Sequence, residues 1–432
     1  MRGEAIINPV TRVGGNLEMT VRWEQGVVSK VLVSGLCSRN MGEKMVGRTP
    51  EAAQLFSSRI CGECGFSHFL ASRKAIRKIQ GRQADCSRLE ELLLAIHMVL
   101  GHLKSFYFSI LPDYGQFSAA LPFVMEGEAQ ADCRLEEPVF RQMEENRERV
   151  WKAVGKVGQA VSPLTGKWVH GQLAEGAQLD RTTVFGLKKL LLLLEELSSV
   201  LERDIRLLAA AYQDYFYIGG GNTNFIDFGC FPQWYCRGGW KNPLREGAVS
   251  PEQITLDFSR SWKEADGQTD FLKKGAYSQL FSAGYQQMPY EMGPVARQRL
   301  VGRDSGGSSV MERLLAIGEE TAVLCRGMGS LLEQAQEPEK ASPVQRQTGK
   351  GLGMAPCCGG SILHLAQMQE GQITEYRIIS PCHWNLAPQN SQGNPSPVQT
   401  AILGTQFPEK ETGLLAVKRI LRSFVPCLYC GG

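Results

Sequence analysis

The sequence predicts a mainly helical α+β protein, in which a core bundle of long helices is flanked by small peripheral antiparallel sheets. Leucines surround much of a long helical stretch that starts near Asp180, as expected for a helix packed on several sides at the centre of a bundle. The first 35 residues instead alternate apolar and polar side chains, as in NLEMTVRW and VVSKVLVSG. Such alternation is typical of half-buried strands, so this end of the chain is expected to form a small sheet.

Helical spacing recurs in further stretches, the first of which has Ser87 as its N-cap. These stretches are residues 87–110, 136–157, 308–335 and a last helix that starts near 398 or 411 and ends at 423. Residues 361–379 alternate as a hairpin with its turn at Glu370-Gly371. We therefore expect one domain over residues 1–432, with a sheet at 1–35, the bundle core at 85–215, and a hairpin, a helix and a cysteine pair at 349–432.

Charge and composition exclude several classes of protein. The formal net charge is +3 and no long run of Lys or Arg occurs, so a nucleic-acid or anionic-membrane partner is not expected. The sequence has no apolar stretch of the length of a membrane span, and its first ten residues lack the apolar core of a signal peptide. We expect a cytoplasmic protein without membrane insertion. In that compartment 13 cysteines favour free thiols and metal ligands over disulfides.

Two Cys-x-x-Cys pairs lie at opposite ends of the chain, Cys61 with Cys64 and Cys427 with Cys430. His68 follows the first pair. Two residues between cysteines allow both sulfurs to reach one metal ion, and the fold has to bring the distant pairs together. Four thiolates suit zinc, an iron–sulfur cluster or a nickel–iron centre. The spacing alone equally fits two unrelated pairs.

Six segments in order resemble the large subunit of nickel–iron hydrogenases. RICGECGFSH matches that family's R-I-C-G-x-C-x-x-x-H motif, and VPCLYCGG is similar to its D-P-C-x-x-C-x-x-H ending. INPVTRVGGNLEM, SILPDYG, GGNTNFIDFGCFP and ISPCHWNLAPQ resemble further family segments between and before these motifs. The resemblance implies a hydrogenase large-subunit-like fold.

The resemblance also implies a ligand set. In the family four cysteines hold nickel, and the inner cysteine of each pair bridges to an iron that carries two cyanides and one carbon monoxide. Carried over, Cys61 and Cys427 would be terminal nickel ligands, while Cys64 and Cys430 would bridge. His68 would lie beside them and donate a hydrogen bond to a bridging sulfur.

Departures from the family concentrate at positions with chemical roles. Gly14 replaces a glutamate that passes protons to and from a bridging cysteine, and glycine cannot be a general base. Cys357-Cys358 stands where the family's A-P-R-G segment supplies an arginine over the open metal position. Cys382 and His383 stand where hydroxyls hydrogen-bond a cyanide.

Of the other family features around the metal, some are changed and one is retained. Val425 replaces the aspartate before the last pair, whereas Asp113 is a retained polar neighbour. We expect Asp113, His68, Cys357 and Cys382 to lie beside the four cysteine ligands. The chain ends two residues after Cys430, without the family's histidine, and Gly42 replaces a glutamate, so we expect no magnesium.

Retained ligands beside lost catalytic groups favour a hydrogenase maturation scaffold over an enzyme. On this hypothesis the chain is most similar to the large-subunit-like maturation proteins of the HupK/HoxV type. It would hold an Fe(CN)2(CO) fragment, or a nickel–iron precursor, and pass it to a hydrogenase large subunit with the help of maturation chaperones.

Two alternatives stay open. The chain could instead be a divergent catalytic or hydrogen-sensing large subunit, an oxidoreductase acting on H2. It would then bind nickel and a small subunit with iron–sulfur clusters, and Glu63 would be the replacement base. The third hypothesis is a structural zinc module.

Overall fold

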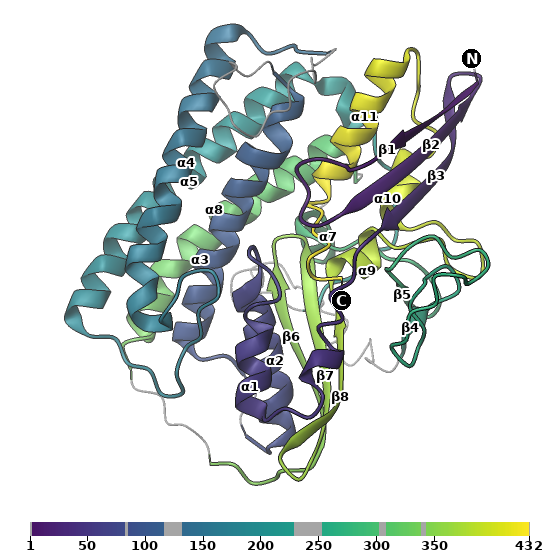
Figure 1. Ribbon diagram of the computed structural model, residues 1–432. Coiled ribbons are helices and arrows are strands. Elements are labelled where there is room, and N and C mark those ends of the chain that lie inside the picture. The colour runs from purple at the N-terminus through teal and green to yellow at the C-terminus, as the bar shows by residue number, and fades with distance from the viewer. Residues whose placement is uncertain are drawn as a thin grey trace.

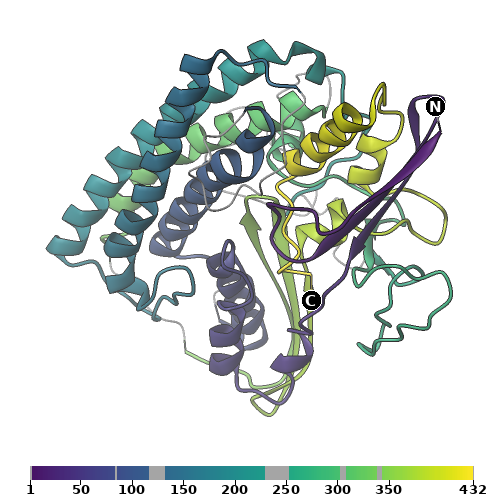
Figure 2. The same ribbon diagram turned by 45° about the horizontal axis from the view of Figure 1, so that its top comes forward.

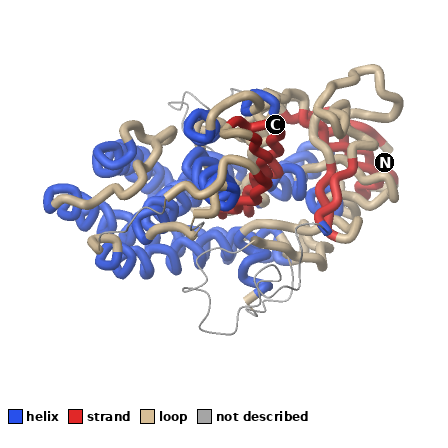
Figure 3. The backbone as a smooth tube through the Cα atoms, turned by 90° about the horizontal axis from the view of Figure 1, so that it is seen from below, coloured by secondary structure: helices blue, strands red, loops and turns tan. Residues whose placement is uncertain are grey.

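The computed structural model describes residues 2–82, 85–115, 132–228, 253–301, 308–337 and 343–431. Long helices gather on one side of the molecule and strands on the other (Figures 1 and 3). The helices are α1 Pro50–Ser57, α2 Gly65–Ile79, α3 Arg88–Lys104, α4 Glu137–Thr165, α5 Arg181–Ala211, α7 Pro294–Leu300, α8 Val310–Gln334, α9 Pro381–Asn385, α10 Pro397–Ile402 and α11 Lys410–Ser423.

The helical core packs α3 and α5 against α8, with α4 outside α5 (Figure 1). Side-chain caps fix where these helices begin: Ser87 and Ser309 form capping boxes at α3 and α8, and Asp180 accepts from Thr183 N at α5. Beyond α3 the chain continues as a π-turn, Ser105–Ile110, and a 3-10 turn, Leu111–Asp113. This continuation carries Asp113 toward the second cysteine pair.

Three antiparallel sheets lie among the described residues. One sheet pairs β1 Gly3–Ile7, β2 Leu17–Glu24 and β3 Val27–Gly35, and a second pairs β4 Ile254–Asp257 with β5 Ser282–Tyr285. The third pairs β6 Gly349–Cys357, β7 Gly360–Gln369 and β8 Gln372–Ile379. The C-terminus lies beside this third sheet, on the side away from the long helices, as Figures 1 and 2 show.

Helix α2 packs directly on β6 because two glycines of the strand permit a close approach. A Cβ on Gly353 would lie 1.9 Å from the carbonyl oxygen of Ala71, and one on Gly351 would lie 2.1 Å from that of Ala75. No side chain fits in that space. The packing fixes α2, and with it the first cysteine pair, against the strand that ends at Cys357.

The predicted fold class is confirmed: the protein is helix-rich and has small antiparallel sheets. The N-terminal sheet, the Ser87 N-cap and the hairpin turn at Glu370-Gly371 lie where the pattern placed them. One boundary was wrong, because α4 runs on to Thr165. Of the two predicted starts of the last helix, the one near 411 is confirmed by α11, and the stretch near 398 forms a separate helix, α10. The division into a single domain stays a prediction.

One helical stretch, Arg88–Asp113, is long and apolar enough to cross a membrane, although the sequence analysis expected no such stretch. Of its most apolar window, 72% is buried inside the protein. Packing against α8 and α5 accounts for that burial, as in the core helix of a bundle.

Candidate metal centre

Four thiols from the two ends of the chain meet at one place, which we call the thiol cluster: Cys61, Cys64, Cys427 and Cys430. The sulfurs of Cys61 and Cys427 are 3.6 Å apart, and those of Cys64 and Cys430 are 3.0 Å apart. Within the second pair, Cys427 and Cys430 are separated by 3.9 Å. The fold therefore joins residues more than 360 positions apart into one sulfur-rich site.

These spacings fit metal ligands. A metal–sulfur bond of about 2.3 Å places two sulfurs of a tetrahedral site about 3.8 Å apart. The distances from Cys427 to Cys61 and to Cys430 match that edge. The shorter distance between Cys64 and Cys430 suits two thiolates that share a second metal. Soft sulfur donors of this kind suit nickel, iron and zinc.

The first pair is held by the start of α2. Cys64 is the residue before that helix, and the backbone N–H of Glu63 donates to the sulfur of Cys61 at 3.3 Å. Gly65 allows the turn to lie against the preceding helix, because a Cβ there would be 2.4 Å from the carbonyl oxygen of Ser58. The first pair is thus placed at a closely packed helix start.

The second pair is held by backbone contacts to three other segments. The N–H of Leu428 donates to the carbonyl oxygen of Gly14 at 2.5 Å, and Ser380 Oγ donates to the carbonyl oxygen of Cys430 at 2.9 Å. The guanidinium of Arg39 donates to the carbonyl oxygens of Ile60 and Tyr429. Arg39 therefore connects the two cysteine motifs directly.

A buried ion cluster anchors the helix that leads into the second pair. Arg422 Nη1 lies 2.6 Å from both carboxylate oxygens of Asp113, and Arg12 Nη2 lies 2.6 Å from one of them. Burial alone would raise the pKa of Asp113, but Arg422 and Arg12 outweigh it and hold the pKa below its ordinary range. The expected polar neighbour Asp113 thus supports the site and does not line it.

His68 lies against the thiol cluster, with a ring nitrogen within 4.8 Å of the sulfurs of Cys64 and Cys430. Its Nδ1 is 2.9 Å from Nε2 of His364, whose Nδ1 is 2.6 Å from the Tyr376 hydroxyl. Burial lowers the pKa of His68 to about 4, which keeps the ring neutral.

The cluster titrates as one unit. Hydrogen bonds with Cys427 and Cys430 hold the pKa of Cys61 well below that of a free thiol. Hydrogen bonds with Cys430 and Cys61 raise the pKa of Cys427 well above it. A negative charge on Cys61 is therefore shared with neighbouring thiols that keep their protons.

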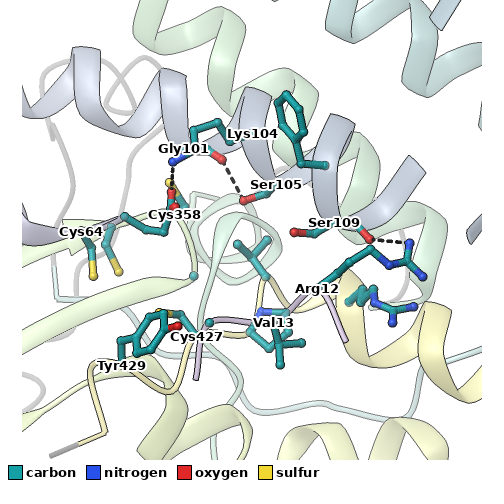
Figure 4. Close-up of a pocket in the computed structure, with 18 of the residues that line it drawn as sticks. Arg12, Val13, Cys64, Gly101, Lys104, Ser105, Ser109, Cys358, Cys427 and Tyr429 are labelled. Atoms are coloured by element: carbon teal, nitrogen blue, oxygen red, sulfur yellow. Dashed lines mark hydrogen bonds and ion pairs between the residues drawn. The ribbon is translucent and has the colours of Figure 1, made fainter. Parts of the chain in front are cut away.

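A cavity of about 900 Å3 leads from the surface to the cluster. The exposed residues Glu148, Trp151 and Lys152 line its outer part. Cys64, Cys358 and Cys427 reach it from three separate elements, as Figure 4 shows.

We call Gly14, Cys357 and Cys358, which also line the cavity, the open wall. A Cβ on Gly14 would lie 2.9 Å from the sulfur of Cys427, so the wall has little room for a larger residue there. Cys357 is buried and interacts with Cys64, while the thiol of Cys358 is 3.4 Å from the carbonyl oxygen of Met98.

The other expected residues lie nearby in different settings. Cys382 is buried behind the cluster, with its sulfur 3.1 Å from Ser380 Oγ. Glu63 lines the cavity as a partner of Lys104 Nζ at 2.5 Å. No motif or spacing in the sequence marks Arg39, His364 or Ser380 as site residues, because residues of these types gain such a role only in the folded context. Cys230 and Cys236 lie outside the described residues.

Comparisons with known proteins agree with this geometry. Residues 308–431 match the family model described as nickel-dependent hydrogenase. The chain is 25% identical to the periplasmic [NiFeSe] hydrogenase large subunit of Desulfomicrobium baculatum, over 98% of this chain and 93% of that protein. It is 23% identical to the hydrogenase-2 large chain of Escherichia coli, over 98% of this chain and 96% of the relative.

The fold comparison covers the whole chain. The Ni-Fe-Se hydrogenase of D. vulgaris Hildenborough superposes with a TM-score of 0.87 at 22% identity and covers 100% of both chains. The protein therefore has the hydrogenase large-subunit fold, and its sequence is similar to nickel-dependent hydrogenase large subunits from end to end.

Proposed function

We propose that this protein, a relative of nickel-dependent hydrogenase large subunits, is a maturation scaffold. It holds an iron fragment with two cyanides and one carbon monoxide on the thiol cluster, and passes the fragment to a hydrogenase large subunit. The observation that carries the proposal is a complete set of four thiols beneath an open wall made of glycine and cysteine. Holding a metal fragment requires donor side chains such as these thiols, whereas splitting hydrogen also requires a base beside them.

The lack of a well-placed carboxylate base beside the thiols, among the described residues, supports this proposal. Among the described residues that line the cavity, the carboxylates are those of Glu63 and Glu148. Glu63 is paired with Lys104, and Glu148 lies in the exposed outer part of the cavity. At Gly14 the contact with Cys427 opposes any side chain. The centre is thus equipped to bind and poorly equipped to move a proton.

The cavity supports transfer to a partner. Its outer part lies among exposed residues and its inner part at the sulfurs, so a maturation chaperone or a recipient large subunit has a route to the cargo. The described cysteines are free thiols, which fits work in the reducing cytoplasm.

The test is anaerobic purification from a host that makes the iron fragment, followed by infrared spectroscopy and metal analysis. The proposal expects cyanide and carbonyl bands, with iron in excess of nickel. Incubation with a metal-free recipient large subunit should move the bands to the recipient. Full nickel occupancy with hydrogen turnover, or tightly bound zinc without these bands, would contradict it.

A second candidate is a divergent catalytic or sensing large subunit, favoured by similarity along 93% to 96% of the lengths of such subunits. It needs nickel and a small subunit with iron–sulfur clusters, and Glu63 would act as the base. Hydrogen-dependent dye reduction by the partnered protein, lost in Glu63→Gln, would establish it.

A further inference from the structure

The second ring nitrogen of His68 is a buried polar atom whose role the thiols alone do not explain. His68 is fully buried, and its Nε2 has no hydrogen-bond partner among the described residues. Leaving such an atom without a partner is unfavourable in a buried site. Since a ring nitrogen lies within 4.8 Å of the sulfurs of both Cys64 and Cys430, these three side chains form a donor group.

A chain of hydrogen bonds sets which nitrogen carries a lone pair. Tyr376 donates its hydroxyl proton to Ser72 Oγ at 2.7 Å, so its oxygen accepts from Nδ1–H of His364. His364 then presents a bare Nε2, which accepts from Nδ1–H of His68. The remaining nitrogen of His68, Nε2, therefore presents its lone pair. Metal-bound histidines are oriented in this way, by a hydrogen bond at the opposite ring nitrogen.

We propose that His68 Nε2 is the third protein ligand of the iron fragment, together with the sulfurs of Cys64 and Cys430, before any nickel is present. This inference rests on the proposed scaffold function. Iron(II) with two cyanides and one carbon monoxide keeps one octahedral face free, which two thiolates and one imidazole fill. Sulfurs at neighbouring octahedral positions lie about 3.3 Å apart for bonds of about 2.3 Å, close to the observed 3.0 Å between Cys64 and Cys430.

The loading step balances without an electron transfer. The iron stays iron(II) and exchanges the donors of the chaperone that delivers it for these three side chains. Cys64 and Cys430 each release one proton as they bind, the departing donors of the chaperone or the solvent take these protons up, and the neutral imidazole of His68 releases none. Cys61 and Cys427 do not bind the iron. The imidazole of His68 fills the iron coordination position that remains.

The test uses two variants of similar size on the full chain, loaded in the same host. His68→Met supplies a thioether, which ligates low-spin iron but donates no hydrogen bond. His68→Gln supplies a hydrogen-bond donor that is a poor ligand for this iron. We expect His68→Met to retain the fragment with a shifted carbonyl band. We expect His68→Gln to bind at least about tenfold less iron than the wild type. His170→Gln, outside the cavity, is the matched control and should keep the fragment.

The opposite result overturns the inference. If His68→Gln keeps the fragment with unchanged bands and His68→Met loses it, then His68 donates a hydrogen bond to sulfur and does not bind the iron. X-ray absorption at the iron edge tests the wild-type protein without any substitution. We expect two sulfur neighbours for each iron and scattering from one imidazole, and three or more sulfurs without imidazole would contradict the ligand role. A wild-type protein without cyanide or carbonyl bands would instead overturn the scaffold function, and this inference with it.

Discussion

The thiol cluster and the open wall face the same cavity, but they are built differently. Each cysteine pair is held by packing or hydrogen bonds from other segments, as in the contact of Leu428 with Gly14 and the link of Arg39 to both motifs. The open wall offers glycine and thiol side chains where a base and a cation would serve catalysis. The site thus combines closely held thiols with a wall whose residues, Gly14, Cys357 and Cys358, include no carboxylate or arginine.

Removing one thiol of the thiol cluster should have the largest effect on the amount of bound iron. Cys430 belongs to both groups of candidate metal ligands, one with Cys61 and Cys427 and one with Cys64 and His68. We expect Cys430→Ser to lower the iron bound to the loaded protein at least about tenfold, because hydroxyl replaces thiolate at a shared position. Metal analysis after gel filtration measures it.

Cys325 provides the control for that substitution. It is a buried thiol on α8 that contacts the carbonyl oxygen of Leu194, remote from the cluster in the structure. Cys325→Ser should leave the iron content unchanged. Equal iron in Cys430→Ser and the wild type would show that the thiol cluster is not the binding site.

Breaking the ion cluster behind the second pair should have the next largest effect. Asp113→Ala leaves Arg422 and Arg12 buried without their carboxylate. We expect the free energy of unfolding to fall by about 3–5 kcal/mol, since an unpaired buried charge is costly. Denaturant titration measures the loss. Asp266→Ala, in an exposed loop, should change stability by less than about 0.5 kcal/mol.

The same cluster predicts a pH dependence. The pKa of Asp113 is lower in the folded protein than in the unfolded chain, so its contribution to stability is present above the unfolded value of about 3.9. That contribution is lost as the pH falls through the lower folded pKa. The stability difference between wild type and Asp113→Asn should therefore shrink below about pH 4. A difference that grows in acid would reverse the assigned direction of the pKa shift.

The sequence predicted the four clustered thiols better than their surroundings. The Cys-x-x-Cys spacing identified all four thiols that the fold brings together, because two sulfurs on one turn are a local feature. The helix cap at Ser87 and the helix start near Asp180 were local as well. His364 and Arg39 became relevant only through contacts across long stretches of chain, and no spacing rule identifies such pairs.

The third sheet shows the same limit. Alternation identified the hairpin of β7 and β8, but the sequence analysis did not identify β6 as a strand. Gly349, Gly351 and Gly353 weaken the strand pattern, although two of them are what lets α2 pack on β6. A tertiary contact thus explains residues that oppose the local preference.

Filling the open wall should have a smaller effect. A Cβ on Gly14 would meet the sulfur of Cys427 at 2.9 Å, so Gly14→Ala should cost about 1–3 kcal/mol of stability. Gly14→Glu adds a carboxylate at the same place, and we expect no hydrogen-dependent dye reduction from it. Gly186→Ala, on α5 with open space around it, should stabilise the protein by about 1 kcal/mol. Hydrogen turnover by Gly14→Glu would show that one missing base separates the protein from an enzyme.

Substituting the thiols of the open wall should have the smallest effect on bound iron. Cys358 is fixed by contact with the carbonyl oxygen of Met98, and Cys357 reaches Cys64 but belongs to neither group of candidate ligands. We expect Cys357→Ser and Cys358→Ser each to keep the iron fragment with its infrared bands, and to lose about 1 kcal/mol of stability as a buried thiol becomes a hydroxyl. The two variants and Cys430→Ser are compared in one loading experiment. If Cys357→Ser lost as much iron as Cys430→Ser, Cys357 would be a fifth thiol that binds the iron fragment and not part of the open wall.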